Sequence, residues 1–125
     1  MRGDAFYNNA FNVNADKVVN NSLDNNIFWA SWYNYYRVIK QANAVIKFTP
    51  QVLEAGGISA EKADDVMGQA YCLRAFTYFW IIRIWGDAPL VTAPYLDSND
   101  SFDLPKAAVA DIVEQIHSDL ENALT

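Results

Sequence analysis

The residues best suited to ligand binding are aromatic and lie close together in the first third of the sequence. They are Trp29, Trp32, Tyr33, Tyr35 and Tyr36. A flat aromatic face can stack on the apolar C–H face of a pyranose ring. The helical spacing of most of these side chains favours core packing instead. Trp29 lies beside that apolar stripe, and Asn34 carries an amide that can donate to and accept from sugar hydroxyls. These two are the candidate ligand-binding residues.

Arg74 is a charged residue inside an apolar helical run. A buried charge without a partner is strongly destabilising, so the guanidinium must meet a carboxylate or a set of carbonyl groups. The sequence therefore predicts that Arg74 forms a structural ion pair and does not bind a ligand. Asn43 is predicted to be a similar buried, hydrogen-bonded residue.

Two further patterns resemble metal sites, but for both of them a solvated surface is the favoured interpretation. Glu114-x-x-His117 has the spacing of a ligand pair on a helix, but it lies opposite the apolar face. Asp97-x-Asn99-x-Ser101-x-Asp103 imitates the start of a calcium loop, although Phe102 and Ala108 replace the required glycine and glutamate. His117 is the single histidine, and no phosphate loop or nucleophile motif occurs. We expect no metal, no cofactor and no enzymatic activity.

The elements that must position these residues are helices. Apolar residues at helical spacing predict a first helix from about Ile27; they are Phe28, Trp32, Tyr35, Ile39, Ala42 and Ile46. Pro50 predicts its end near Phe48 or Thr49, because the residue before a proline avoids the helical region. Gly56-Gly57 then predicts a flexible turn.

A second helix is predicted from Ala60 to about Trp85, with Ser59 as its N-cap and Gly86 at its end. Its predicted buried stripe is Val66, Ala70, Leu73, Thr77, Trp80 and Ile84. The C-terminal half is apolar nearly all round, which predicts burial on several sides. Cys72 lies in this run and is expected to be a small buried hydrophobe.

After Pro105 a third helix is predicted, with an apolar face that comprises Val109, Ile112, Val113, Ile116, Leu120 and Leu124. Residues 87–105 are predicted to form a polar loop, and residues 1–26 an Asn-rich irregular segment. No strand is expected. The predicted class is all-α: a tetratricopeptide-like hairpin plus a third amphipathic helix. The second helix has more apolar surface than one partner covers, so we expect residues 1–125 to be a fragment of a larger α-rich fold.

Composition limits the partners. The formal charge of −6 and nine scattered basic residues argue against nucleic acid, which requires clustered Lys and Arg. The most apolar window, Ala75–Ile82, is far shorter than the roughly 20 residues that span a bilayer. No export signal is visible near Met1. Either the protein is cytoplasmic, or an export signal lies upstream of this chain.

Four segments in order resemble the N-terminal part of the RagB/SusD family. They are Trp32-x-x-x-Tyr36-x-x-Ile39-x-x-Ala42-Asn43, Ala70-x-x-Leu73-Arg74-Ala75-x-x-Tyr78-Phe79, Trp85-Gly86-Asp87-Ala88-Pro89-Leu90 and Ile112-x-x-x-Ile116-x-x-Asp119-Leu120-x-x-Ala123. One departure is Lys106-Ala107-Ala108, where family members often carry Arg and Ser, so a poorly capped third helix is expected.

The resemblance implies an exported outer-membrane lipoprotein that is anchored through a lipid upstream of this chain. It further implies that the protein captures oligosaccharide and passes it to a SusC-like TonB-dependent transporter. One alternative is a tetratricopeptide-like scaffold that binds only protein. Another is a hydrolase domain, which would need catalytic acids outside this chain.

Overall fold

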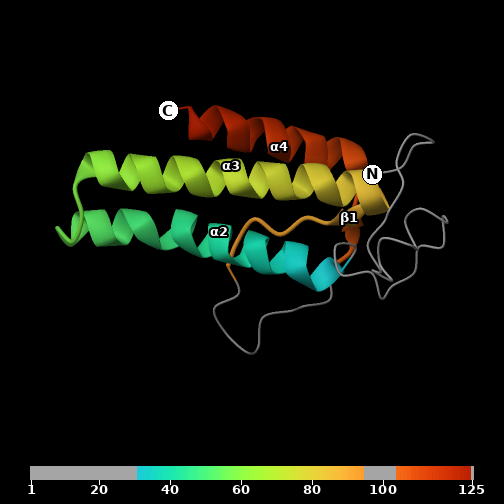
Figure 1. Ribbon diagram of the computed structural model, residues 1–125, viewed down its shortest axis with the longest axis horizontal. Coiled ribbons are helices and arrows are strands. Elements are labelled where there is room, and N and C mark those ends of the chain that lie inside the picture. Colours follow the sequence, from blue (N-terminus) through green and yellow to red (C-terminus); the bar gives the residue numbers. More distant parts are fainter. Residues whose placement is uncertain (1–30, 95–103, 125) are drawn as a thin grey trace, which may run out of the picture. The chain divides into compact units, whose positions relative to one another are not determined.

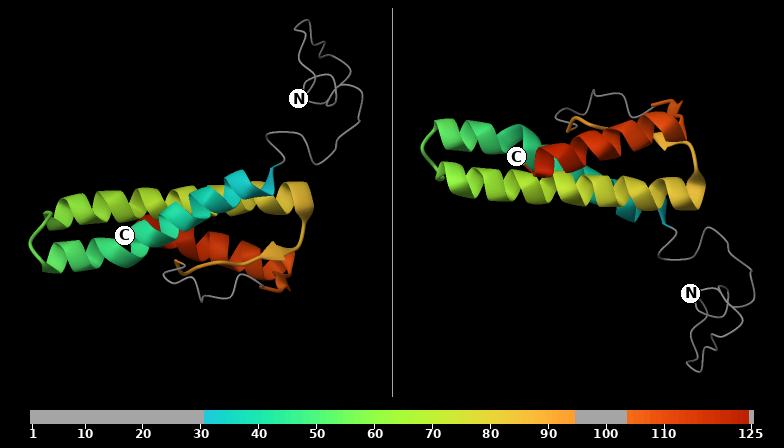
Figure 2. Two further views of the ribbon diagram at one scale, coloured as in Figure 1. Left: turned by 90° about the horizontal axis from the view of Figure 1, so that it is seen from below. Right: turned by 90° about the horizontal axis from the view of Figure 1, so that it is seen from above.

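The computed structural model describes residues 31–94 and 104–124, and most of them are helical. The helices are α2 (Trp32–Glu54), α3 (Ala60–Trp85) and α4 (Val109–Ala123). Figure 1 shows that α2 and α3 form an antiparallel hairpin, and the views of Figures 1 and 2 agree that α4 runs alongside α3. The predicted all-α class, a hairpin plus a third helix, is confirmed. The Asn-rich segment 1–26 lies outside the described residues.

The predicted bounds of α3 are confirmed, and both of its ends are capped as the sequence indicates. The hydroxyl of Ser59 accepts a hydrogen bond from the backbone N–H of Lys62 at 3.3 Å. At the other end Gly86 adopts φ +74°, and its N–H donates to the carbonyl of Ile82. A positive φ is sterically cheap only for glycine, so α3 ends there.

The predicted end of α2 is wrong, because the helix continues through Pro50 to Glu54. The fixed φ of proline is compatible with a helix. Pro50 therefore destabilises α2 only through the backbone hydrogen bond that it cannot donate and through crowding against the preceding turn. The residue that terminates the helix, two positions after Glu54, is Gly56, which adopts φ +72°. Gly57 N–H donates to Val52 O and Gly56 N–H to Leu53 O, both at 2.9 Å. This pair of bonds is a Schellman motif, which satisfies the last carbonyl groups of the helix.

The expectation of no strands is also wrong, although the sheet is small. Strand β1 (Ala88–Pro89) pairs antiparallel with β2 (Lys106–Ala107), with Ala88 opposite Ala107. Ala88 and Val91 are buried, so part of the predicted polar loop belongs to the core. A strand of two residues has no alternation that a sequence pattern could reveal.

The start of α4 is capped from a distance. Its N-cap residue, Ala108, has no side-chain oxygen. Instead the carboxylate of Asp87 accepts a hydrogen bond from the N–H of Val109 at 3.0 Å. A negative charge at this position also interacts favourably with the helix dipole. The loop after α3 therefore completes the first turn of α4.

The buried face of α3 matches the predicted stripe only in part, at Ala70 and Thr77. Its buried side chains are Ala63, Ala70, Arg74, Ala75, Thr77, Tyr78 and Ile81. Leu73 and Trp80, which were predicted to be buried, are exposed, and so is Cys72. In α4, Val109, Leu120 and Leu124 are likewise exposed, while Ile112 and Ile116 are buried. Small side chains such as Ala63, Ala70 and Ala75 let a neighbouring helix approach this face closely.

In the part of the chain that the structure describes, no helix has the length and apolar character needed to cross a membrane.

We predict that Asp87→Ala destabilises the protein by about 1 kcal/mol, because the first N–H groups of α4 lose an acceptor. Urea unfolding followed by circular dichroism measures this change. Asp64→Ala, an exposed acidic position on α3, is the matched control and should change the free energy of unfolding by less than about 0.5 kcal/mol. Equal effects of the two substitutions would contradict a capping role for Asp87.

Candidate functional site

The most connected set of polar side chains is buried where the three helices meet. Asn43 of α2, Arg74 of α3 and Asp119 of α4 form it, and we call it the Arg74 cluster. Arg74 Nε donates to Asp119 Oδ2 at 2.8 Å and Nη2 to Oδ1 at 2.6 Å. Arg74 Nη1 donates to Asn43 Oδ1 at 2.7 Å. The ion pair is therefore bidentate, the geometry in which guanidinium and carboxylate interact most strongly.

The cluster is shielded from water. Arg74 is 4% exposed and Asp119 is completely buried. Gln115 donates a further hydrogen bond to Asp119 Oδ1 at 2.8 Å, and the guanidinium of Arg74 also lies over the ring of Tyr71. Every buried side-chain nitrogen and oxygen in residues 31–94 and 104–124 has a hydrogen-bond partner. A buried ion pair is tolerated only when its remaining hydrogen-bonding capacity is used in this way.

The same side chains hold the extended segment that follows β1. Three successive carbonyl groups, those of Val91, Thr92 and Ala93, accept hydrogen bonds from them. Asn43 Nδ2 donates to Val91 O at 3.0 Å and to Ala93 O at 3.2 Å. Arg74 Nη1 donates to Thr92 O at 3.2 Å. These bonds replace the strand partner that this segment lacks over these residues, and they tie it to α2 and α3.

Tyr78 provides another anchor for this segment. Its hydroxyl donates to Val91 O at 3.1 Å and accepts from Val91 N–H at 2.7 Å. Tyr36 OH donates to Pro89 O at 2.6 Å, so α2 also contacts β1. Side chains of α2 and α3 therefore fix the backbone from Pro89 to Ala93.

Tyr35 and Trp85 join the start of α2 to the end of α3. Their rings meet edge to face, with centroids 5.3 Å apart. Burial raises the pKa of the Tyr35 phenol above its ordinary value, because the charged form loses solvation. This contact lies directly before Gly86, at which α3 ends, and Asp87, which caps α4.

The structure places the predicted site residues in different surroundings. Asn34 lies in the first turn of α2, where its backbone N–H donates to Ser31 O at 3.1 Å. Arg74 is at the centre of the Arg74 cluster. Trp29 lies outside the described residues. Glu114 and His117 are exposed, and no group of three or more potential metal-binding side chains occurs among the described residues.

Asp119 is the important residue that sequence reasoning missed as a partner of Arg74. A signal was available, because Asp119 lies three residues after Ile116 and seven after Ile112, on the same face of the helix. A carboxylate on an apolar face requires a cation, and Arg74 requires an anion. Helical spacing alone does not tell which buried acid meets which buried base.

The arrangement of these side chains is that of a structural scaffold. The charges of the Arg74 cluster neutralise one another and bond backbone carbonyls, so they stabilise structure and leave no polar group directed at a ligand. The described residues form a helical hairpin scaffold with an ordered segment laid along it. Such a scaffold suits binding, in which preorganised surfaces matter more than reactive groups.

Comparison with known proteins gives the family. The family model described as "Starch-binding associating with outer membrane", a SusD-like family, matches residues 1–125. The chain therefore belongs to the SusD-like family. SusD-like protein P38 of Formosa agariphila is 30% identical over 85% of this chain, and SusD-like protein P2 of the same organism is 33% identical over 86%. The matches cover only 20% and 21% of those two proteins.

Solved structures agree with this assignment. A SusD superfamily protein from Bacteroides thetaiotaomicron has a TM-score of 0.75 at 27% identity, over 90% of this chain and 26% of that one. A laminarin-binding SusD-like protein has a TM-score of 0.71 at 25% identity, over 86% of this chain and 22% of its own. A structure with xylogluco-oligosaccharide has a TM-score of 0.65 at 29% identity, over 82% of this chain and 19% of its own.

We predict that Asp119→Ala lowers the free energy of unfolding by about 3–5 kcal/mol, because it leaves the Arg74 guanidinium buried without its counter-ion. Arg74→Met combined with Asp119→Leu should recover much of this loss, since the pair of charges is then replaced by apolar groups. Urea unfolding of the single and double variants measures the coupling between the two positions.

The matched control for these variants is Glu121→Ala, an exposed acid on the same helix, which should change stability by less than about 0.5 kcal/mol. If Asp119→Ala costs no more than Glu121→Ala, the Arg74 cluster does not hold the helices together.

Proposed function

We propose that this chain is part of an outer-membrane protein that captures glycan and passes oligosaccharide to a TonB-dependent transporter. The observation that carries the proposal is the family match over residues 1–125, whose description is starch-binding at the outer membrane. Two structural relatives support a glycan ligand, since one binds laminarin and another was solved with xylogluco-oligosaccharide. Capture and transfer require no covalent step.

The geometry supports a positioning role for this region. The Arg74 cluster, Tyr78 and Tyr36 hold the backbone from Pro89 to Ala93 against α2 and α3. Asp87 then fixes the start of α4. A frame whose connections are fixed in this way loses little further conformational freedom on binding, which favours affinity. The proposed contribution of these residues is therefore a rigid frame for surfaces that contact glycan and transporter.

Trp29 and Asn34 are the proposed ligand-contacting residues of this chain. The indole of Trp29 would stack on a pyranose ring, and the Asn34 amide would hydrogen-bond its hydroxyl groups. The proposal for Trp29 rests on its residue type and its place in the sequence. The protein would be exported and lipid-anchored through a segment upstream of Met1, which would bring these residues to the cell surface.

The second candidate function is a protein-interaction scaffold without a ligand of its own. The exposed apolar side chains of α3, among them Leu73 and Phe76, favour it because such surfaces form protein interfaces. The two candidates differ in whether the purified full-length protein binds carbohydrate.

We predict that the full-length protein binds oligosaccharides on a carbohydrate array, with laminarin and xyloglucan oligosaccharides as the first probes. Trp29→Ala should weaken the binding about tenfold, which corresponds to about 1.4 kcal/mol and is the scale expected for one lost aromatic contact. Isothermal titration calorimetry with the strongest array ligand gives the two dissociation constants.

Phe48→Ala is the matched control, because Phe48 is an exposed aromatic residue of the same region, and its loss should leave the affinity unchanged. Absence of binding to every glycan on the array would overturn glycan capture and favour the protein scaffold. Equal affinities of wild type and Trp29→Ala would remove Trp29 from the site.

A further inference from the structure

The outward side of α2 is basic, although the chain as a whole is acidic. Arg37, Lys40 and Lys47 are exposed, and their intervals of three and seven residues place them on one side of the helix. With three basic residues and one acidic residue, α2 has a net charge of +2, whereas the whole chain has −6. The rest of the chain therefore carries −8, and α2 is a basic element in an acidic protein.

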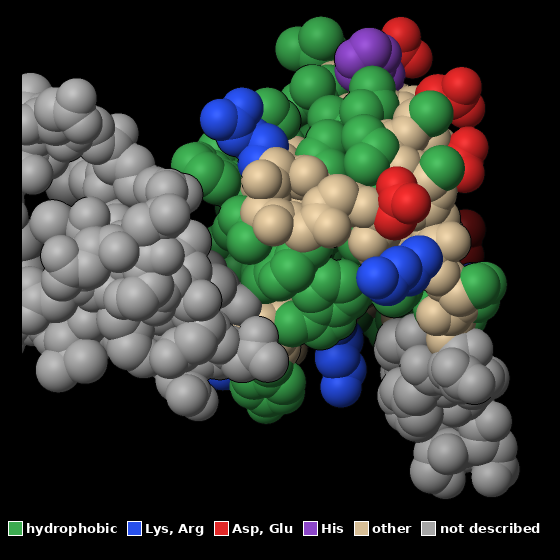
Figure 3. Space-filling view, turned by 90° about the vertical axis from the view of Figure 1, so that its right-hand side faces the viewer, with side chains coloured by type: hydrophobic (Ala, Val, Ile, Leu, Met, Phe, Trp, Pro, Cys, Tyr) green, Lys and Arg blue, Asp and Glu red, His purple; other side chains and the backbone are tan. Residues whose placement is uncertain are grey.

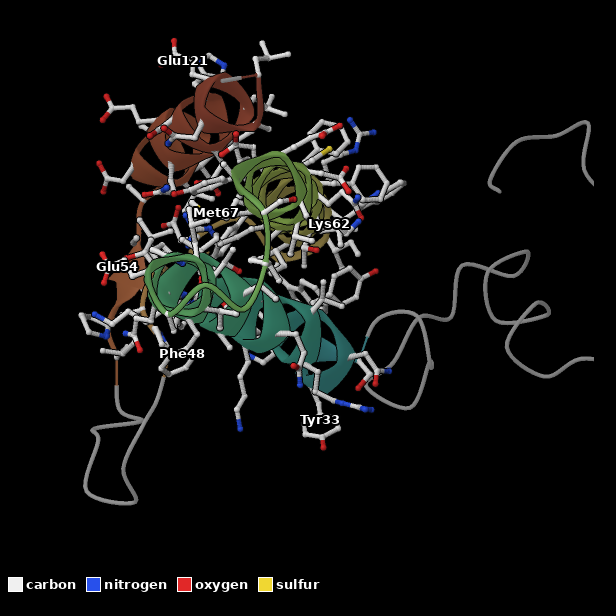
Figure 4. All side chains as sticks on the ribbon, turned by 90° about the vertical axis from the view of Figure 1, so that its left-hand side faces the viewer. Tyr33, Phe48, Glu54, Lys62, Met67 and Glu121 are labelled. Carbon is white, nitrogen blue, oxygen red and sulfur yellow. The ribbon has the colours of Figure 1, made fainter. Side chains whose placement is uncertain are left out.

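Apolar side chains border these basic ones. Val38, Phe48 and Val52 are between 39% and 43% exposed. Phe48 and Val52 are four residues apart, so they are neighbours on the helix surface. In Figure 4 the labelled Phe48 projects from α2 on the side away from α3 and α4. We call this mixed surface the α2 outer face; it comprises Arg37, Val38, Lys40, Lys47, Phe48 and Val52.

The acidic side chains of α4 lie elsewhere on the molecule. Asp111, Glu114 and Glu121 are exposed. In Figure 4 Glu121 projects from α4 at the edge of the view opposite to Phe48. Figure 3 shows acidic side chains in the upper half of the surface and a basic side chain projecting at the lower edge, the side on which α2 lies. A molecule with separated charges of this kind becomes oriented in the field of a charged surface.

No described carboxylate neutralises Lys40 or Lys47. Among the described residues the ion pairs are Lys62–Asp65 and Arg74–Asp119. The seven residues between the two lysines separate them by about 10 Å along the helix axis. Each ammonium group can therefore contact a different anionic group, while its aliphatic stem lies along the apolar side chains beside it.

The α2 outer face suits an extended anionic surface better than a small ligand. It is one side of a helix of 23 residues, which is about 35 Å long. A convex helix surface does not enclose a small molecule in the way that a ligand pocket does. Basic residues beside aromatic and aliphatic ones are typical of helices that lie in the headgroup layer of a membrane, because the cations bind phosphate groups and the apolar side chains enter between the headgroups.

We propose that the α2 outer face lies on the phosphate-bearing headgroup layer of the outer membrane, with Lys40 and Lys47 on phosphate groups and Phe48 and Val52 between the headgroups. The inference rests on the outer-membrane location in the proposed function, which follows from the family description. A single lipid chain gives only marginal and reversible membrane binding, and a basic patch supplies a second contact. Contact along α2 would also fix the orientation of the protein on the membrane.

The test measures cosedimentation of the full-length protein, produced without a lipid anchor, with vesicles of two compositions. One is phosphatidylcholine alone, and the other is equal parts of phosphatidylcholine and phosphatidylglycerol. We expect binding to the anionic vesicles only, and weaker binding as NaCl is raised, because salt screens the attraction. Lys40→Glu and Lys47→Glu should each weaken it about 25-fold, since a reversal changes two charges and each charge near the surface contributes about fivefold.

Lys62→Glu is the matched control, because it makes the same change of charge at an exposed lysine of α3 and should leave vesicle binding unchanged. Phe48→Ala should weaken binding to the anionic vesicles severalfold and leave glycan affinity unchanged. Equal binding by Lys40→Glu and Lys62→Glu, equal binding to both vesicle compositions, or no binding to the anionic vesicles would each overturn the proposal.

A different partner for the α2 outer face would also be visible in these experiments. If the protein binds a TonB-dependent transporter in phosphatidylcholine vesicles, loses this binding on Lys40→Glu and does not bind anionic lipid, the face belongs to the transporter and the proposal is overturned. The carbohydrate array tests glycan capture on the same protein without vesicles, so membrane contact and glycan capture can each fail without the other.

Discussion

The buried ion pair between Arg74 and Asp119 is the interaction on which the described structure depends. Moving two charges out of water is costly, and the attraction between them compensates only when the geometry is good and the remaining donors are satisfied. Here the bidentate contact, the Asn43 amide and the Thr92 carbonyl meet that requirement. Since these groups come from three helices and the segment after β1, no helix can leave without breaking a hydrogen bond of the buried Arg74 guanidinium. The cluster therefore couples elements that are distant in the sequence.

The short loop between α3 and β1 connects the end of α3 to the start of α4. Trp85 contacts Tyr35, Gly86 ends the helix, and Asp87 caps the next one. Each position has a separate physical requirement: an aromatic ring, a positive φ and a carboxylate. The loop thus combines an aromatic contact, a helix end and a helix cap within three successive residues.

The polar groups in the interior of the described residues serve to stabilise the structure. In the described residues the buried polar side chains bond to one another and to backbone, so the interior provides rigidity and no reactive centre. The surface of α3 is divided between a solvated half around Asp65 and an apolar half that exposes Leu73, Phe76, Phe79 and Trp80. In a SusD-like protein several times longer than this chain, such a hairpin is well suited to be a frame that other segments cover.

The sequence by itself determined the helices, the caps at Ser59 and Gly86, the family, and the need of Arg74 for a partner. These features depend on local periodicity, on backbone conformation within one turn, or on the cost of burying one charge. Only the tertiary structure decided that the partner is Asp119, that Asp87 caps α4, and which side of α3 stays open. Those outcomes join residues 45 and 22 positions apart; helix packing brings Arg74 to Asp119, and the pairing of β1 with β2 lies beside the contact of Asp87 with Val109. The continuation of α2 beyond Pro50 is a local outcome that the sequence prediction missed, because the proline signal is only a tendency and the helix ends instead in the Schellman motif at Gly56.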